Sequence, residues 1–209
     1  LLIPNDAECR GTGRKRSPNS IKSLLDRFTL HPPSPQNHAH PNPQIQEREH
    51  TDHRHLQKGS RGIPNGQIVI VQGFAADRHR VAFADEGVTL REAGITMPVV
   101  VLNADSDSFE IMIDYGLEPE IYSLRSLHEF AAAVERYGEQ RYPIHVKLDT
   151  GMHRLGFVEE ELPALLDALA RCGRTVRVAS VFAHLCTSDD PAQDDFTRLQ
   201  IARFDRMSS

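Results

Sequence analysis

The sequence predicts an α/β fold in which a parallel sheet is covered by helices. Over residues 68–209, apolar bursts alternate with helix-period stretches about five times, with strand starts roughly 18–33 residues apart. The run Pro98–Leu102 is β-branched without polar alternation, which suits a strand buried on both faces. An open doubly wound sheet and part of an eight-fold β/α barrel both fit, because a complete barrel needs about 250 residues. The pattern alone does not choose between them.

Each predicted strand is a short apolar run that ends at a change of pattern. The predicted strands are 68–71, 81–84, 98–102, 120–122, 144–148 and 176–184. In either architecture, functional side chains gather where such strands end at their carboxyl termini.

Each predicted helix combines an apolar face with an end signal. Asp85 is expected to cap the first helix, which ends near Gly94, and a second spans about 108–115 before Gly116. The later faces are, in order, Leu127, Phe130, Ala131 and Val134 before Gly138; Leu162, Leu165, Leu166 and Leu169 before Gly173; and Phe196, Leu199 and Phe204 within 191–207.

Residues 1–67 differ from the rest in composition. They hold 8 of the 13 prolines, only 14 apolar residues and a net charge of +4, against −9 for residues 68–209. So few apolar residues cannot offset the entropy of ordering the chain. We therefore expect 1–67 to be a disordered or non-homologous segment. The exception is 20–30, where Ile21, Leu24, Leu25 and Phe28 share one helix face.

Composition also excludes some functions. The net charge of −5 rules out a chain-wide basic surface for nucleic acid, and no stretch reaches the roughly 20 apolar residues of a membrane helix. Three scattered cysteines favour a reducing compartment, so we expect a cytoplasmic location. Five histidines of 38–55 lack cysteine partners and a folded frame, so we expect no metal site. Because the chain starts at Leu1, we expect a fragment.

The junction at 145–157 carries the densest set of reactive side chains. Lys147 falls within a strand that otherwise reads as buried, and Arg154 lies just past its end. A buried ammonium is costly unless it is paired or chemically altered, and a guanidinium offers a rigid fork of donors. The alternative is that Lys147 extends to solvent and Arg154 pairs with Asp149 on the surface. The residues leave both open.

Two further candidates lie at the end of the 176–184 strand. His184 is either a structural histidine or part of a site, and Cys186 reads as a small buried apolar residue rather than a nucleophile.

At 147–157 the chain resembles a known family. The segment KLDTGMHRLGF resembles the K-x-D-T-G-M-x-R-x-G motif of bacterial alanine racemases. The stretches 82–103 and 180–204 resemble later β/α units of the same enzymes, in the same order and spacing. The sequence of these stretches most resembles the Bacteroidetes type of the family, in which the racemase is often fused behind a Mur ligase. The resemblance implies an eight-fold β/α barrel, of which about units 2–6 are present.

The resemblance also implies site residues and a cofactor, pyridoxal phosphate. Lys147 matches a lysine that is often carbamylated, and Arg154 matches an arginine that contacts the cofactor's phenolic oxygen and the substrate carboxylate. His184 matches a histidine beneath the cofactor ring. The resemblance implies L- and D-alanine as substrates, interconverted for peptidoglycan synthesis. It also implies a homodimer, as in the family.

Two expected catalytic groups are missing from the chain. The family's first strand carries a Schiff-base lysine, whereas 68–76 here reads IVIVQGFAA, with Gln72 near the expected place. The catalytic tyrosine of the family's second domain has no counterpart in the sequence. Racemisation needs a base on each face of the substrate. We therefore expect no racemase activity from this chain. A non-catalytic barrel that binds pyridoxal phosphate, and an interaction fragment, remain as alternatives.

Overall fold

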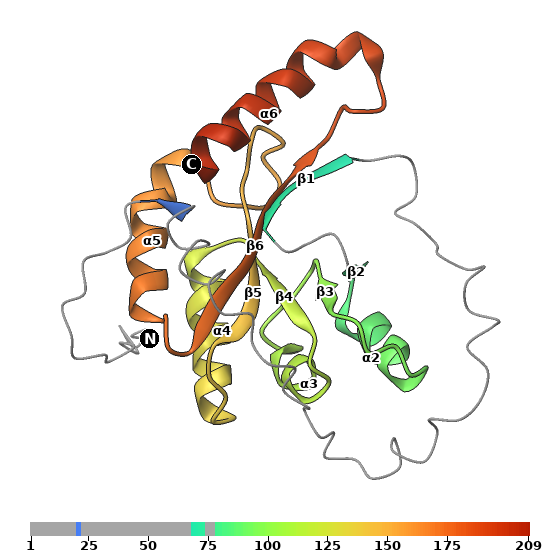
Figure 1. Cartoon of the computed structure of the whole chain (residues 1–209), viewed down its shortest axis with the longest axis vertical. Coiled ribbons are helices and arrows are strands. Elements are labelled where there is room, and N and C mark those ends of the chain that lie inside the picture. Colours follow the sequence, from blue (N-terminus) through green and yellow to red (C-terminus); the bar gives the residue numbers. More distant parts are fainter. Residues whose placement is uncertain (1–19, 22–67, 74–77) are drawn as a thin grey trace, which may run out of the picture.

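The structure is a computed structural model that describes residues 20–21, 68–73 and 78–209 (Figure 1). Most of the segment expected to be disordered, and most of the helix expected at 20–30, lie outside the described residues. Ile21 is described, and it is 2 % exposed within the apolar core.

Six strands form one sheet in the order β1-β6-β5-β4-β3-β2. The strands are β1 (Ile68–Gly73), β2 (His79–Val81), β3 (Val99–Val101), β4 (Glu118–Ile121), β5 (Tyr142–Lys147) and β6 (Val176–Leu185). From β2 to β6 each strand is parallel to the next. These five strands curl into half of a barrel, with helices on the outside (Figure 1). The predicted partial barrel is confirmed.

The helices lie between the strands in sequence, as the pattern predicts. They are α2 (Ala84–Glu92), α3 (Phe109–Asp114), α4 (Leu124–Arg136), α5 (Leu162–Arg171) and α6 (Asp194–Ser208), with short 3-10 turns η3 (Glu159–Glu161) and η4 (Pro191–Gln193). None of the helices in the described part of the chain is long and apolar enough to cross a membrane.

Strand β1 departs from the predicted parallel series. It is a strand, but it pairs antiparallel with β6, at the opposite edge of the sheet from β2. Only residues 74–78 separate β1 from β2, whereas a parallel crossover takes at least ten to twelve residues. The six steps of the chain from Gly73 to His79 span at most about 22 Å, so the two edges of the sheet must approach each other. The curl of the half-barrel allows this (Figure 1).

Alternation along the strands separates an apolar outer face from a polar inner face. Val99, Val101, Ile121, Ile144 and Val146 are each at most 1 % exposed and belong to the core cluster between sheet and helices. Successive strand residues point to opposite faces. The residues between these apolar positions therefore face the inside of the half-barrel, and several of them are charged.

Three local expectations are corrected. Helix α2 starts at Ala84 with Phe83 at its N-cap, so Asp85 lies in the first turn instead of capping it, and the preceding strand ends at Val81. The last helical segment starts with a 3-10 turn, and its Leu199 is 45 % exposed. Leu199 points outward because the buried side of α6 is formed by Gln200, Phe204 and Met207.

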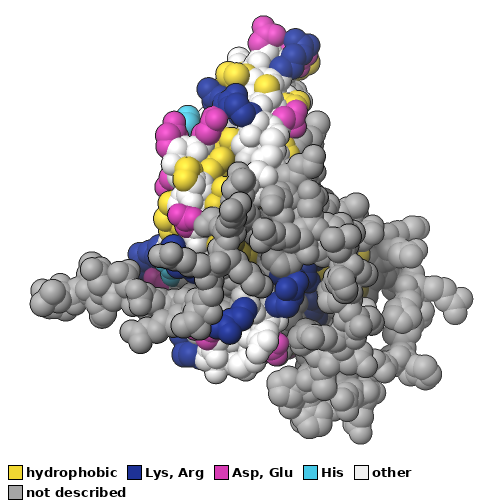
Figure 2. All heavy atoms as spheres, turned by 60° about the vertical axis from the view of Figure 1, so that its left-hand side comes forward, with side chains coloured by type: hydrophobic (Ala, Val, Ile, Leu, Met, Phe, Trp, Pro, Cys, Tyr) yellow, Lys and Arg dark blue, Asp and Glu magenta, His cyan; other side chains and the backbone are white. Residues whose placement is uncertain are grey.

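Charged side chains lie on the surface of α6, among apolar ones (Figure 2). Arg206 makes two hydrogen bonds with Glu159, of 2.9 and 2.7 Å, which tie α6 to η3. Arg198 pairs with Asp194 and Asp195 on the same helix. Figure 2 shows acidic and basic side chains interspersed there rather than separated by sign.

Candidate functional site

The inner face of the half-barrel carries two layers of polar side chains. In the layer toward the amino ends of the strands, His145 Nε2 lies 2.7 Å from Glu118 Oε2 and His145 Nδ1 lies 2.6 Å from Ser180 Oγ. Arg78 also contacts Glu118. The second layer lies two residues further along β4 and β5, toward their carboxyl ends, and contains Glu120 and Lys147.

The first layer is an internally satisfied network. Burial lowers the pKa of His145 by more than Glu118 raises it, so the imidazole is neutral near pH 7. Burial raises the pKa of Glu118, but the hydrogen bond from His145 and the charge and hydrogen bond of Arg78 outweigh it, so this carboxyl stays ionised. A carboxylate only accepts, so Nε2–H donates to Glu118 and Nδ1 accepts from Ser180. This layer has a structural role at the amino ends of the strands.

The second layer is only partly satisfied. Lys147 Nζ lies 3.5 Å from Glu120 Oε1 and 5.2 Å from the centre of the Phe182 ring, which gives the ammonium an ion pair and a cation–π contact. Glu120 is fully buried, and neither of its oxygens has a hydrogen-bond partner among the described residues. At 3.5 Å the pair is held by charge rather than by a well-formed hydrogen bond. Burial raises the pKa of Glu120 to about 7, although Lys147 and Arg154 lower it.

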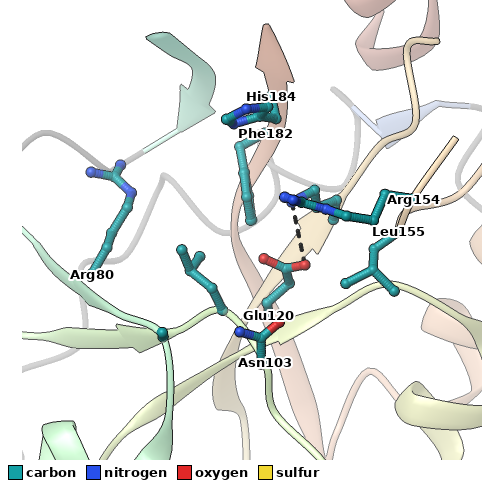
Figure 3. A pocket seen from close by; sticks show the side chains of 10 residues that line it. Arg80, Asn103, Glu120, Arg154, Leu155, Phe182 and His184 are labelled. Atoms are coloured by element: carbon teal, nitrogen blue, oxygen red, sulfur yellow. Dashed lines mark ion pairs between the residues drawn. The ribbon is translucent and has the colours of Figure 1, made fainter. Parts of the chain in front are cut away.

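This layer forms the floor of a pocket of about 130 Å³. Figure 3 shows Glu120 at its centre, with Arg80 on one side and Arg154 on the other. The remaining lining residues include Asn103, Phe182 and His184. His184 Nε2 is buried and lacks a partner in the described part of the chain. Burial, then the charges of Lys147 and Arg154, lower the pKa of His184, so its ring is neutral near pH 7.

Three cationic side chains against one carboxyl favour an anionic ligand in this pocket. The three are Arg80, Lys147 and Arg154, and the carboxyl is Glu120. Burial, then the charge of Arg78, lower the pKa of Arg80, yet a guanidinium stays protonated in proteins. The parallel strands end on this side of the sheet, where functional groups of barrel folds collect.

The loop at 149–157 sets the place of Arg154. Phe157 N–H donates to Lys147 O and Asp149 N–H donates to Phe157 O, each at 2.9 Å, so the loop closes onto the end of β5. A Cβ on Gly156, at φ +123°, would lie 2.7 Å from Asp149 N. Only glycine fits this close approach without a shift of the backbone.

Asp149 organises the first half of the same loop. Its Oδ1 accepts from Gly151 N–H at 2.9 Å and from His153 N–H at 3.0 Å, and its Oδ2 lies 3.1 Å from His153 Nδ1. Burial raises the pKa of Asp149, but the backbone donors of His153 and Gly151 outweigh it, so the pKa lies below its usual range. Asp149 thus binds the loop, rather than Arg154 as the surface alternative proposed.

Helix α6 supports the pocket from behind through one buried amide. Gln200 is 0 % exposed, and its Nε2 donates to His184 O at 3.1 Å and to Thr150 Oγ1 at 3.3 Å. Its Oε1 accepts from Cys186 N–H at 3.2 Å. Cys186 is half-buried, with Sγ 3.6 Å from Gln200 Oε1, so the expectation of a buried apolar residue was wrong. The contacts join α6 to the ends of both β5 and β6.

The residues singled out from sequence meet in one place. Lys147, Arg154 and His184 all line the pocket, and Lys147 is buried rather than extended to solvent. The sequence did not identify three residues of the site and its support, namely Glu120, Arg80 and Gln200. A signal for Glu120 existed, because this carboxylate is the first residue of the predicted strand 120–122.

Metal-ligating side chains do not gather in the described ranges. No group of three or more histidine, cysteine or carboxylate side chains there could hold a metal ion. The histidines of 38–55, with the expectation that they form no metal site, lie outside those ranges.

Comparison with known proteins places the chain in a family. The sequence model described as "Alanine racemase, N-terminal domain" matches residues 64–209. The alanine racemase of Pectobacterium atrosepticum is 36 % identical over 144 residues, which is 68 % of this chain and 39 % of that protein. The alanine racemase of Carboxydothermus hydrogenoformans is 33 % identical over 148 residues, or 70 % of this chain and 38 % of that protein.

Solved structures give the same result. Alanine racemase from Clostridium difficile 630 superposes with a TM-score of 0.59 at 27 % identity, over 64 % of this chain and 35 % of that one. The chain spans about two fifths of the length of the curated relatives it matches. With the half-barrel and the matched range together, the chain belongs to the alanine racemase N-terminal domain family.

Proposed function

We propose that the pocket is part of the cofactor and substrate site of an alanine racemase that uses pyridoxal phosphate. One observation carries the proposal: Lys147 from β5, Arg154 from the following loop and His184 from β6 line the same cavity. These are the three positions for which the family resemblance implies a role. The substrates would be L- and D-alanine. The whole protein would supply D-alanine for peptidoglycan in the cytoplasm, as a homodimer.

The described residues fit one side of pyridoxal phosphate. The cationic lining suits a ligand with phosphate and phenolate groups, and the unpartnered His184 Nε2 offers a hydrogen-bonding atom. The cavity of about 130 Å³ is smaller than the roughly 300–1,000 Å³ of typical ligand pockets. The described residues therefore supply part of the wall of such a site.

Each side chain has a separate task in this proposal. When bound, pyridoxal phosphate supplies a ring that accepts electrons from the α-carbon of an amino acid. Arg154 directs its planar fork at a carboxylate or phenolate oxygen. His184, neutral near pH 7, donates or accepts one hydrogen bond without adding charge. Gln200 holds the backbone of His184 in place through His184 O.

We further propose that the 209-residue chain by itself does not racemise alanine. Proton removal from one face of the α-carbon and return to the other requires two bases. Lys147 is the only lysine in 68–209, and it is paired with Glu120. Gln72 lies in β1, next to Val181 of β6. The alternatives are a barrel that binds the cofactor without catalysis, and part of a racemase fused to a Mur ligase.

The test combines cofactor binding with a turnover assay on the full chain. We expect pyridoxal phosphate to bind, seen by its absorbance and fluorescence, and Arg154→Ala to weaken binding by about ten- to a hundredfold, since a hydrogen bond to a charged group contributes about 1.5–3 kcal/mol. Arg198→Ala is the control, because Arg198 lies exposed on α6 and pairs with Asp194. No D-alanine should form.

The opposite outcomes are equally clear. Equal binding by the wild type and Arg154→Ala, or no binding at all, would overturn the assignment of the pocket. Measurable conversion of L- to D-alanine would overturn the proposed inactivity. Borohydride reduction followed by peptide mapping adds one distinction, because a single labelled lysine would favour the non-catalytic cofactor-binding barrel.

A further inference from the structure

We propose that Glu120 is a positioning residue that keeps Lys147 as an unmodified ammonium, so that this chain uses a carboxylate where the family resemblance implies a lysine carbamate. The inference rests on the proposed function for its meaning, since both groups lie in the proposed cofactor pocket. Its evidence is the buried pair itself, with Nζ of Lys147 3.5 Å from Oε1 of Glu120 (Figure 3).

Glu120 depends on the charge of Lys147. Its side chain is 0 % exposed, and neither oxygen has a hydrogen-bond partner in the described part of the chain. A buried carboxylate with no donor is tolerated only when a nearby cation compensates it. Lys147 supplies the ion pair, and Arg154 adds a weaker attraction. Removing the positive charge of Lys147 would leave Glu120 without its partner.

Carbamylation would remove that charge and reverse its sign. In the reaction, the ammonium first loses a proton to solvent and the neutral amine nitrogen then attacks the carbon of carbon dioxide. An N–C bond forms, one C–O π bond opens to give the anionic oxygen, and a second proton leaves the nitrogen to solvent. The product is an anion in place of a cation. Above about pH 7, where Glu120 is ionised, the carbamate would lie beside a second anion inside the half-barrel, where like charges repel strongly because little water screens them.

The neighbouring layer shows why Glu120 differs from Glu118. Glu118 faces the same side of β4, but it bonds to His145 at 2.7 Å and contacts Arg78. Its compensation does not involve Lys147. The two carboxylates of β4 therefore have separate partners. Only the carboxylate of Glu120 affects whether Lys147 is an ammonium or a carbamate. The other charged or titratable groups around the pocket are Arg80, Arg154 and His184.

The experiment is carbon-13 NMR of the full chain in labelled bicarbonate, without added cofactor, at a pH above 7 so that Glu120 is ionised. We expect no lysine carbamate resonance in the wild type. Glu120→Gln, which removes the anion at nearly constant shape, should allow the resonance to appear. Lys147→Arg in the same background should abolish it, which assigns the signal. Glu118→Gln is the matched control and should give no carbamate.

Each outcome bears on the inference. A Lys147 carbamate in the wild type overturns it, as does a folded Glu120→Gln protein that stays unmodified at high bicarbonate. Should Glu120→Gln fail to fold, the wild-type spectrum still decides, because a carbamate there contradicts the proposal and its absence supports it. Failure of pyridoxal phosphate binding would overturn the proposed function while leaving this result unaffected.

Discussion

Glu120 makes the stability of the protein depend on pH near neutrality. Burial raises its pKa from 4.5 to about 7, so between these values the folded chain retains a proton that the unfolded chain has released. The stabilisation is complete below about pH 4.5 and is lost as the pH rises to about 7. At about 1.4 kcal/mol per pKa unit, the loss is about 3 kcal/mol.

Glu120→Gln should remove this pH dependence. The amide stays neutral, so the free energy of unfolding of the wild type should fall relative to the variant between pH 4.5 and 7. Denaturant titrations of both proteins at several pH values measure the difference. Because Glu118 and His145 titrate in both proteins, their contributions cancel in the comparison. Parallel curves for wild type and variant would contradict the assigned burial of Glu120.

Among the elements, α6 is attached to the sheet by a buried amide as well as by apolar packing. Phe204 and Met207 are 5 % and 4 % exposed, yet Gln200 between the helix and the strand ends is 0 % exposed. A buried polar group that loses its partner destabilises a fold by about 1–3 kcal/mol. The link between α6 and the pocket therefore depends on hydrogen bonds that apolar periodicity cannot reveal.

Gln200→Leu should lower the free energy of unfolding by about 2–4 kcal/mol, since it leaves His184 O and Cys186 N–H without their side-chain partner. Urea unfolding measures the change. Leu199→Gln, at the adjacent and 45 % exposed position, should alter stability by less than about 0.5 kcal/mol. Equal effects at the two positions would show that Gln200 is not buried as described.

For the whole molecule, the placement of β1 decides which sheet edge is covered. The half-barrel has edges at β6 and β2, and an exposed strand edge promotes aggregation. β1 covers the β6 edge from Ile68, opposite Leu185, to Gly73, opposite Ser180. An antiparallel strand thus occupies the edge at which a further parallel strand would continue a barrel.

Replacing both Val69 and Ile70 by proline should uncover this edge. One of any two consecutive residues in an antiparallel strand donates to its neighbour, and proline lacks the donor. We expect faster hydrogen exchange in 180–185 and larger species in size-exclusion chromatography. The double threonine variant keeps both N–H groups and should behave as the wild type. Unchanged exchange in the proline variant would refute the pairing.

The sequence predicts the repeating units better than their closure. The order of the parallel strands and helices follows from apolar runs and helix end signals, which report local burial, although β2 overlaps the predicted strand 81–84 only at Val81. The pairing of β1 does not, because 68–71 has the same apolar pattern whichever edge it joins. The observed bounds of β1 and β2 leave only residues 74–78 between them, too few for a parallel crossover, and these bounds were not predicted from the sequence.

The same division holds for the site. The place of Lys147 within an apolar run left burial and extension to solvent both open, and the structure shows that the side chain is buried. The partner of that lysine could not be read from the sequence, since Glu120 lies on another strand and acts only through the register of β4 and β5. Periodicity specifies the face on which a side chain lies, and strand register specifies what it meets there.

The two layers of paired side chains along β4 and β5 also favour the correct register between these strands during folding. Val146 pairs with Ile121 on the outer face, while His145 and Lys147 face the carboxylates on the inner face. A slip of one residue between these strands would set apolar side chains against the carboxylates and turn the cations toward the helices. A slip of two would separate Glu118 and Glu120 from their present partners. The charges that equip the pocket therefore also discriminate against misaligned sheets, so substitutions there are expected to produce misfolded chains as well as altered sites.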